Sequence, residues 1–150
     1  MIALSITDEN VKTFMNVLLK SEAFDLLCCR QATIASFVSF DINGQLFSEE
    51  EDKKEYCKWS QLRPFAFDII KNGKKPSFMK YVFSAADELR DSLSDNAAAL
   101  FINITFQNGE IMLTGGYSQR VFSMDKHGDA MWDEYICELL KTAGINYQKV

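Results

Sequence analysis

The sequence predicts an α+β fold in which helices pack on one side of one or two antiparallel sheets. Segments of alternating apolar and polar residues, rich in β-branched and aromatic side chains, are interleaved with segments of helical spacing. Asn-Gly follows an alternating segment at 43–44 and again at 108–109, where it is a strong signal for a hairpin. A chain of 150 residues with two Pro and seven Gly is expected to form a single domain, 1–150, of long regular elements.

The first half of the chain is expected to hold strands, a hairpin turn and two helices. The first helix follows Asp8, which is a suitable N-cap, and Val11 and Phe14 begin its apolar stripe. The second helix starts near Pro64, which suits a first helical position, and ends at Gly73. The expected ranges are strands at 2–6, 24–31, 33–42 and 45–47, and a second helix at 62–72.

The second half is expected to follow the same order. Ser84 is a candidate cap for a short helix, and Asp87 and Glu88 in its first turn suit the helix dipole. The last helix has the clearest apolar face, formed by Trp132, Tyr135, Ile136, Leu139, Leu140 and Ala143, and Gly144 ends it. The expected strands are 77–85, 100–107, 110–116, 118–124 and a closing strand at 145–150.

This parallel order suggests an internal duplication, with β-α-β-β-β-α halves at 1–76 and 77–150. FDINGQL (40–46) corresponds to FQNGEI (106–111), and each half ends in a helix headed by a tryptophan. A true duplication predicts a molecule with approximate twofold symmetry. TATA-binding-protein-like folds and sliding-clamp domains are analogies of topology only, because a fold does not fix a function.

Composition and charge argue against several classes of function. The net charge of −5 disfavours a nucleic-acid or anionic-membrane surface. No apolar run approaches the roughly 20 residues that span a bilayer, and the start, MIALSITDENVK, lacks the pattern of a secretion signal. We therefore expect a cytoplasmic protein without membrane contact.

The cysteines do not predict a metal centre or a disulfide framework. Cys28, Cys29, Cys57 and Cys137 contain no CxxC pair, and His127 is the one histidine of the chain. Reduced and mostly buried thiols are expected, although Cys57 has basic neighbours in sequence that would favour a reactive thiolate. No motif for a cofactor is found, and none is expected.

The stretch YCKWSQLRPF (56–65) holds the best candidates for a ligand- or partner-binding site. Trp59 and Arg63 are of the types that anchor interfaces and pockets, and Tyr56 and Phe65 add aromatic surface. Arg63 could clamp a carboxylate or a phosphate. The alternative, which we favour, is that Trp59 and Phe65 fill the core while Arg63 pairs with an acid.

Other candidate sites have simpler interpretations. His127 could act as a general base oriented by Asp125 or Asp129, but a loop histidine before a helix that Asp129 caps is the simpler interpretation. Gly115-Gly116 could cradle a phosphate, but a turn or a bulge is favoured. The acidic run Glu49–Asp52 lacks the spacing of a cation site and is expected to be solvated.

At YCKWSQLRPF the sequence resembles a small family of uncharacterised proteins from clostridial bacteria. The similarity extends from IALSIT through LFINITFQNG to the MWDE helix, which is nearly the whole chain. The resemblance implies a bacterial cytosolic origin, and it brings no assigned activity or cofactor.

Three functions remain as hypotheses. The first is a non-enzymatic protein that binds a partner protein or a copy of itself, since alternating strands with an apolar face offer sheet edges for pairing. The second is a small-molecule or anion binder, or a weak enzyme, with Arg63, Trp59 and His127 at a pocket. The third is nucleic-acid binding through Lys71–Lys80, the basic and aromatic segment, which the acidic composition makes the least favoured.

Overall fold

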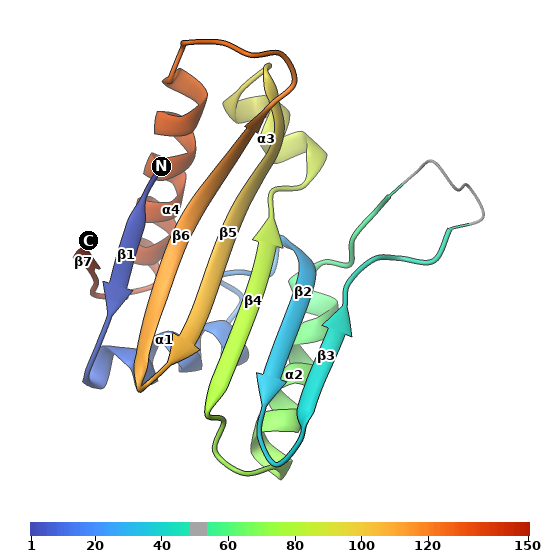
Figure 1. Ribbon diagram of the computed structural model, residues 1–150, viewed down its shortest axis with the longest axis vertical. Helices are drawn as coiled ribbons and strands as arrows, with labels where there is room; N and C mark the ends of the chain where they lie inside the picture. The colour runs from blue at the N-terminus through green and yellow to red at the C-terminus, as the bar shows by residue number, and fades with distance from the viewer. Residues whose placement is uncertain (49–53) are drawn as a thin grey trace.

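The computed structural model describes residues 1–48 and 54–150, and these form an open antiparallel sheet covered by helices (Figure 1). Its strands are β1 (Ala3–Ile6), β2 (Cys28–Ala35), β3 (Ser39–Asn43), β4 (Phe78–Ser84), β5 (Ala97–Gln107), β6 (Glu110–Gln119) and β7 (Gln148–Lys149). In the described part of the chain they make one 7-stranded sheet in the order β3-β2-β4-β5-β6-β1-β7. The predicted α+β class is confirmed.

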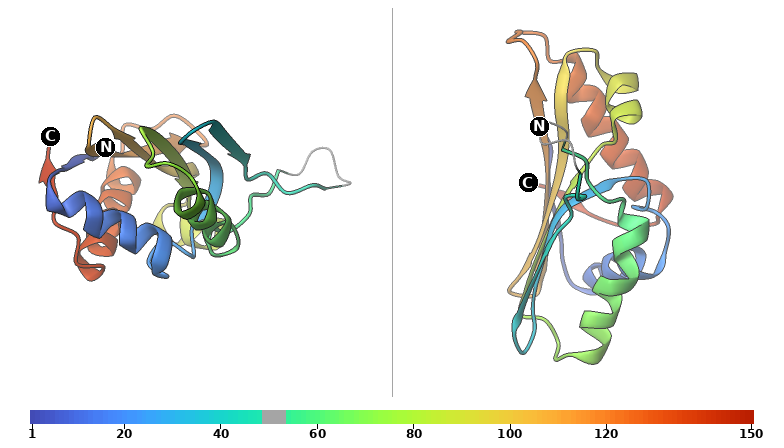
Figure 2. Two further views of the ribbon diagram at one scale, coloured as in Figure 1. Left: turned by 90° about the horizontal axis from the view of Figure 1, so that it is seen from below. Right: turned by 90° about the vertical axis from the view of Figure 1, so that its right-hand side faces the viewer.

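The helices all lie on the same face of the sheet, and the opposite face is open (Figure 2). They are α1 (Glu9–Lys20), α2 (Trp59–Asn72), α3 (Asp87–Leu93) and α4 (His127–Thr142). Because side chains alternate along a strand, Leu4, Phe83 and Leu113 face the helices and are buried. Their neighbours in sequence form the open face.

The core on the helix side is built around two tryptophans that are fully buried. Trp59 packs its ring 5.1 Å from the ring of Phe83, and its indole N–H donates to the Leu18 carbonyl at 2.9 Å. Trp132 donates in the same way to the Phe101 carbonyl at 2.8 Å. Each indole N–H therefore has an acceptor in the core, where burial would otherwise leave it unpaired.

Several predicted elements are confirmed. The second Asn-Gly forms the hairpin between β5 and β6, with Asn108 at φ 54° and Gly109 at φ 75°. The clear apolar helix is α4, and Gly144 follows it at φ 75°, a conformation that glycine adopts without strain. The expected closing strand is the short β7, which pairs with β1.

The continuous strand predicted at 33–42 is wrong, because β2 and β3 are two arms of a hairpin. The chain reverses at Ser36, whose N–H donates to the Val38 carbonyl at 2.9 Å. This turn contains no glycine or proline, and serine, its one usual turn residue, also occurs in strands, so the sequence carried only a weak turn signal there. Phe37 and Val38 are exposed at its tip.

The hairpin predicted at Asn43-Gly44 is also wrong. The Gly44 N–H donates to the Arg30 carbonyl at 3.0 Å, and a Cβ atom at Gly44 would lie 1.8 Å from the Cys29 carbonyl oxygen. Glycine is thus needed here for a close approach of two backbones. The chain beyond it pairs with a later segment through an isolated bridge between Gln45 and Tyr56.

Helix starts were predicted less well than helix ends. The second helix begins at Trp59 and carries Pro64 inside it, where the missing N–H leaves the exposed Ser60 carbonyl open to water. Ser84 does not cap α3, whose N-cap is Ala86. Asp8 stands at the N-cap of α1 without a side-chain capping hydrogen bond.

The separate strand predicted at 118–124 is not found. A single strand, β6, runs from Glu110 to Gln119 and passes straight through Gly115-Gly116. The turn or bulge predicted at these glycines is therefore wrong. Glycine is needed at both positions because a neighbouring side chain packs closely against the backbone. A Cβ at Gly115 would lie 3.2 Å from the side chain of Ile136 in α4.

Candidate functional site

Arg30 occupies a fixed position on the open face of the sheet. It lies at an irregularity of β2, where the register with β4 shifts between Cys29 and Gln31. Its Nε donates to the Ser84 hydroxyl at 3.0 Å. Its guanidinium carbon lies 4.3 Å from the ring centre of Tyr56 and 4.7 Å from that of Phe101. These contacts hold the guanidinium between two aromatic rings.

Tyr56 reaches this position because its segment is inserted beside the start of β2. The Cys29 N–H donates to the Cys57 carbonyl at 2.8 Å, and the Cys57 N–H donates to the Gly44 carbonyl at 2.8 Å. The segment around residue 57 is thus hydrogen-bonded on both sides. The missing side chain of Gly44 allows its backbone to come close to Cys29. The hydrogen bonds of the segment around residue 57 then place the Tyr56 ring beside Arg30.

Phe101 completes the arrangement from β5. It stands between Leu100 and Ile102, which are buried under the helices, so its ring lies on the open face. A Cβ at Gly116, its partner on β6, would lie 3.2 Å from the Cβ of Phe101 and 3.5 Å from its ring. Gly116, which the sequence analysis assigned to a turn or bulge, therefore leaves space for the Phe101 ring.

A cavity of about 560 Å³ opens beside Arg30. Its lining is both polar and apolar, and the side chains come from β2, β3 with the residues that follow it, β4 and the segment around Tyr56. They are Arg30, Gln31, Asp41, Ile42, Asn43, Gln45, Tyr56 and Val82. The Asp41 carboxylate accepts from the Thr33 hydroxyl at 2.8 Å.

Arg30 differs from the other arginines of the chain in its electrostatic surroundings. Arg63 pairs with Asp25 at 2.8 Å, Arg90 with Asp87 at 3.0 Å, and Arg120 with Asp91 at 3.1 Å. Within residues 1–48 and 54–150, no carboxylate forms an ion pair with Arg30. Its neighbours are two rings and a hydroxyl, and the cavity beside it is lined by neutral amides and by the Asp41 carboxylate.

A second feature is the edge of the sheet at β3, which pairs only with β2 among the described residues. The ends of this edge carry exposed apolar side chains. Phe37 is 62% exposed and Val38 48% exposed at one end, while Leu46 and Phe47 are exposed at the other. Apolar side chains beside unpaired backbone groups are a common place for chain association.

The residues predicted within YCKWSQLRPF are separated by the fold. Trp59 is fully buried and Phe65 is exposed on the outside of α2. The Arg63 guanidinium is bound through two hydrogen bonds of 2.8 Å to the Asp25 carboxylate, which raises the pKa of Arg63. Of this group, Tyr56 lines the cavity beside Arg30.

His127 is the first residue of α4 and does not line that cavity. It is exposed, and its backbone N–H donates to Asp125 at 2.9 Å. Asp129 does not orient the imidazole, since its carboxylate accepts from the amino group of Met1 at 2.9 Å. A separate cavity of about 350 Å³ includes His127, Asp125 and the hydroxyl-bearing Ser123.

The cysteines of the described residues are free thiols. Burial raises the pKa of Cys29 to about 12, and burial also raises the pKa of Cys28 and of Cys57. The reactive thiolate considered for Cys57 is not favoured, because its sulfur also contacts the Gln61 side-chain oxygen at 3.1 Å.

The basic segment Lys71–Lys80 does not form one surface. Lys71 and Lys74 are exposed at the end of α2, whereas Lys80 belongs to β4 and pairs with Thr33 and Thr105 across the sheet. The acidic run Glu49–Asp52, predicted to be solvated, lies outside the described residues.

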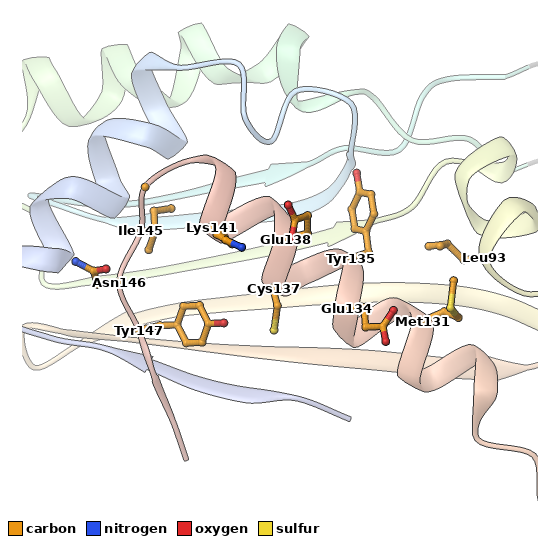
Figure 3. A pocket seen from close by; sticks show the side chains of 11 residues that line it. Leu93, Met131, Glu134, Tyr135, Cys137, Glu138, Lys141, Ile145, Asn146 and Tyr147 are labelled. Atoms are coloured by element: carbon orange, nitrogen blue, oxygen red, sulfur yellow. The ribbon is translucent and has the colours of Figure 1, made fainter.

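An open groove of about 870 Å³ runs along α4 and the segment that follows it (Figure 3). Glu134, Glu138 and Lys141 line it together with Tyr135 and Tyr147. Burial raises the pKa of Tyr135, and a hydrogen bond with Cys137 raises the pKa of Tyr147. The charged side chains spread along the helix and do not converge on one point.

No group of three or more potential metal ligands gathers within the described ranges. In the same ranges, every helix is too short or too polar to cross a bilayer.

The structure is thus an antiparallel sheet with helices on one face, and on the other face Arg30 lies beside the rings of Tyr56 and Phe101. Residues 17–148 match a family of unknown function, DUF5721, and the chain belongs to this family. No curated protein and no solved structure matches the sequence.

Proposed function

We propose that this protein is a non-enzymatic interaction protein that self-associates along the free edge of β3. The observation that carries the proposal is the self-complementary order of the edge segment FVSFDINGQLF (37–47). When two copies of this segment run antiparallel with Ile42 at the centre, apolar residues meet apolar residues and polar residues meet polar ones. A second copy of the chain is therefore the partner that the edge fits best.

The backbone at this edge is suited to such pairing. The Gly44 N–H donates to the Arg30 carbonyl on β2. Because backbone groups point alternately to either side of a strand, the N–H and C=O groups of Asp41 and Asn43 point away from β2. In the proposed register Asp41 of one copy stands opposite Asn43 of the other, and these groups bond reciprocally.

The polar side chains support the same register. The Asn43 side-chain oxygen already accepts from the Gln45 N–H at 3.0 Å, which leaves its NH₂ group free to donate to Asp41 of the second copy. Shifting the strands so that Asp41 meets Asp41 would place like charges opposite each other, which is destabilising. The charges thus select against the neighbouring register.

The exposed apolar residues independently support the register with Ile42 at the centre. With Ile42 at the centre, Phe37 of one copy meets Phe47 of the other, and Val38 meets Leu46. All four side chains are exposed in the single chain. Their burial against each other would stabilise the pair by roughly 25 cal/mol for each Å² of apolar surface removed from water.

The test is the oligomeric state of the purified protein, measured by light scattering after size exclusion over a range of concentrations. We expect a dimer that Asn43→Asp weakens, because two Asp–Asp contacts replace two Asp–Asn contacts, and that Asn43→Lys strengthens. Asn146→Asp adds the same charge at an exposed position away from the edge and should have no effect. A monomer at concentrations up to about 1 mM would sink the proposal.

Related expectations remain proposals as well. Free thiols support a cytoplasmic location, although Cys29 alone of the four is buried, against the expectation of mostly buried thiols. A clostridial origin, a single domain and a duplication at 1–76 and 77–150 stay predictions. Nucleic-acid binding through Lys71–Lys80 is the least supported alternative. The small-anion alternative has one favourable observation, the unpaired charge of Arg30, whereas Arg63 is occupied by Asp25.

A further inference from the structure

We propose that Arg30 is the centre of a binding site for a carboxylate on the open face of the sheet. The ligand is a small monocarboxylate that also carries an amide group, such as an acylated amino acid or the last residue of a peptide. This inference does not rest on edge pairing at β3.

The first argument is the geometry of the guanidinium. The ring centres of Tyr56 and Phe101 lie 4.3 and 4.7 Å from the guanidinium carbon, and Ser84 accepts the Nε–H. The remaining N–H groups, on Nη1 and Nη2, therefore lie along the edge of the plane. A carboxylate binds such an edge with two parallel hydrogen bonds, and the rings hold the guanidinium ready for it.

The second argument is the uncompensated charge. Arg63, Arg90 and Arg120 each bond a carboxylate, although two of these pairs are at exposed positions where they contribute little to stability. The net charge of the chain is −5, so acids outnumber bases. An arginine that is fixed in place and forms no ion pair among the described residues is suited to an acid from outside.

The third argument concerns the class of ligand. The cavity supplies one guanidinium and the amides of Gln31, Asn43 and Gln45, and it also contains Asp41. A phosphate dianion would lack a second cation, and Asp41 would repel its two charges more strongly than the single charge of a monocarboxylate. A monocarboxylate needs one guanidinium, and the neutral amides can bond the peptide-like part of the ligand. The volume of about 560 Å³ lies within the range of small-molecule sites.

The experiment is a nuclear magnetic resonance titration that follows the Nε–H of Arg30 and the backbone amides of Gln31 and Val82, which line the cavity away from the β3 edge. The probes are N-acetylglycine, N-acetylglycine amide and inorganic phosphate. We expect saturable shifts with N-acetylglycine alone. A short peptide with a free or an amidated C-terminus then separates the two sources: tighter binding of the free peptide than of N-acetylglycine assigns the site to a chain terminus.

Variants separate binding from folding. Arg30→Lys keeps the charge but loses the two-bond geometry, and we expect affinity for N-acetylglycine to fall at least about tenfold. Arg120→Lys is the matched control and should bind normally. Tyr56→Leu removes one ring and keeps the arginine, so it should weaken binding while thermal unfolding confirms an intact fold.

Three results would overturn the proposal: no saturable shift, equal binding of phosphate or of the amide, or unchanged affinity in Arg30→Lys. The oligomeric state is measured in parallel on the same samples. Failure of edge pairing leaves the carboxylate titration unaffected, and failure of the titration leaves the dimer unaffected. The two proposals can therefore fail separately.

Discussion

Arg63 and Asp25 provide a direct test of whether the arginine in YCKWSQLRPF has a structural role. The perturbation is a double-mutant cycle with Arg63→Met, Asp25→Asn and the combined variant. The two hydrogen bonds of 2.8 Å join α2 to the connection after α1, and the side chains are only 21% and 12% exposed. Each single change should then leave a half-buried charged partner without its counterpart.

The magnitude follows from this geometry. Charge-assisted hydrogen bonds contribute about 1.5–3 kcal/mol, and the remaining exposure lowers the gain, so we expect a coupling energy of about 2 kcal/mol. The assay is urea unfolding, fitted for the free energy of unfolding of each variant. The exposed pair of Arg120 and Asp91 is the control, with an expected coupling below about 0.5 kcal/mol.

A coupling near zero for Arg63 and Asp25 would refute the reasoning. It would mean that the guanidinium is not held by the carboxylate, and Arg63 would again be available to a ligand. A coupling of the expected size, with carboxylate binding unchanged in Arg63→Met, would place the ligand-binding role elsewhere.

Three further predictions concern the core and the backbone. Trp59→Phe should lower the free energy of unfolding by about 2–4 kcal/mol in urea, because the Leu18 carbonyl loses its donor and a cavity forms; an unchanged midpoint would contradict this. Gly44→Ala should cost more than about 2 kcal/mol in thermal unfolding, since its Cβ would overlap the Cys29 carbonyl, and a neutral result would disprove the close approach. The Cys29 thiol has a folded pKa of about 12 against 9.0, so the folded state holds its proton longer than the unfolded state does. Stability from this thiol is complete below pH 9 and is lost as the pH rises toward 12, and Cys29→Ala should show a shallower decline over that interval; equal slopes would speak against it.

The fold was predictable where local chemistry and packing agree. The apolar stripe of α4 and the turn at Asn108-Gly109 each need only a few neighbouring residues, and both were predicted. The turn at Ser36 was missed because it contains no glycine or proline, and because Phe37 and Val38 at its exposed tip are residues typical of strands. Gly44 was recognised as structurally important, but it was assigned to a tight turn. A close backbone approach also needs glycine, and the sequence does not distinguish the two.

The candidate site was less predictable than the fold. Tyr56 was identified, but as a neighbour of Trp59 and Arg63 in sequence. In space it belongs with Arg30 and Phe101, which come from strands that only the sheet order brings together. An arginine within a strand was the available signal. Which aromatic rings it would meet depends on register, and no local pattern carries that information.

The position of β1 has a consequence for the order in which the protein assembles during synthesis. The first strand lies between β6 and β7, so both of its neighbours leave the ribosome near the end of translation. The hairpin of β2 and β3 can meet β4 much earlier, and β5 and β6 can then extend that sheet. Contacts of large sequence separation form slowly and late. We therefore expect the beginning of the chain to be the last to dock, and a nascent chain stalled before β6 to keep it unpaired.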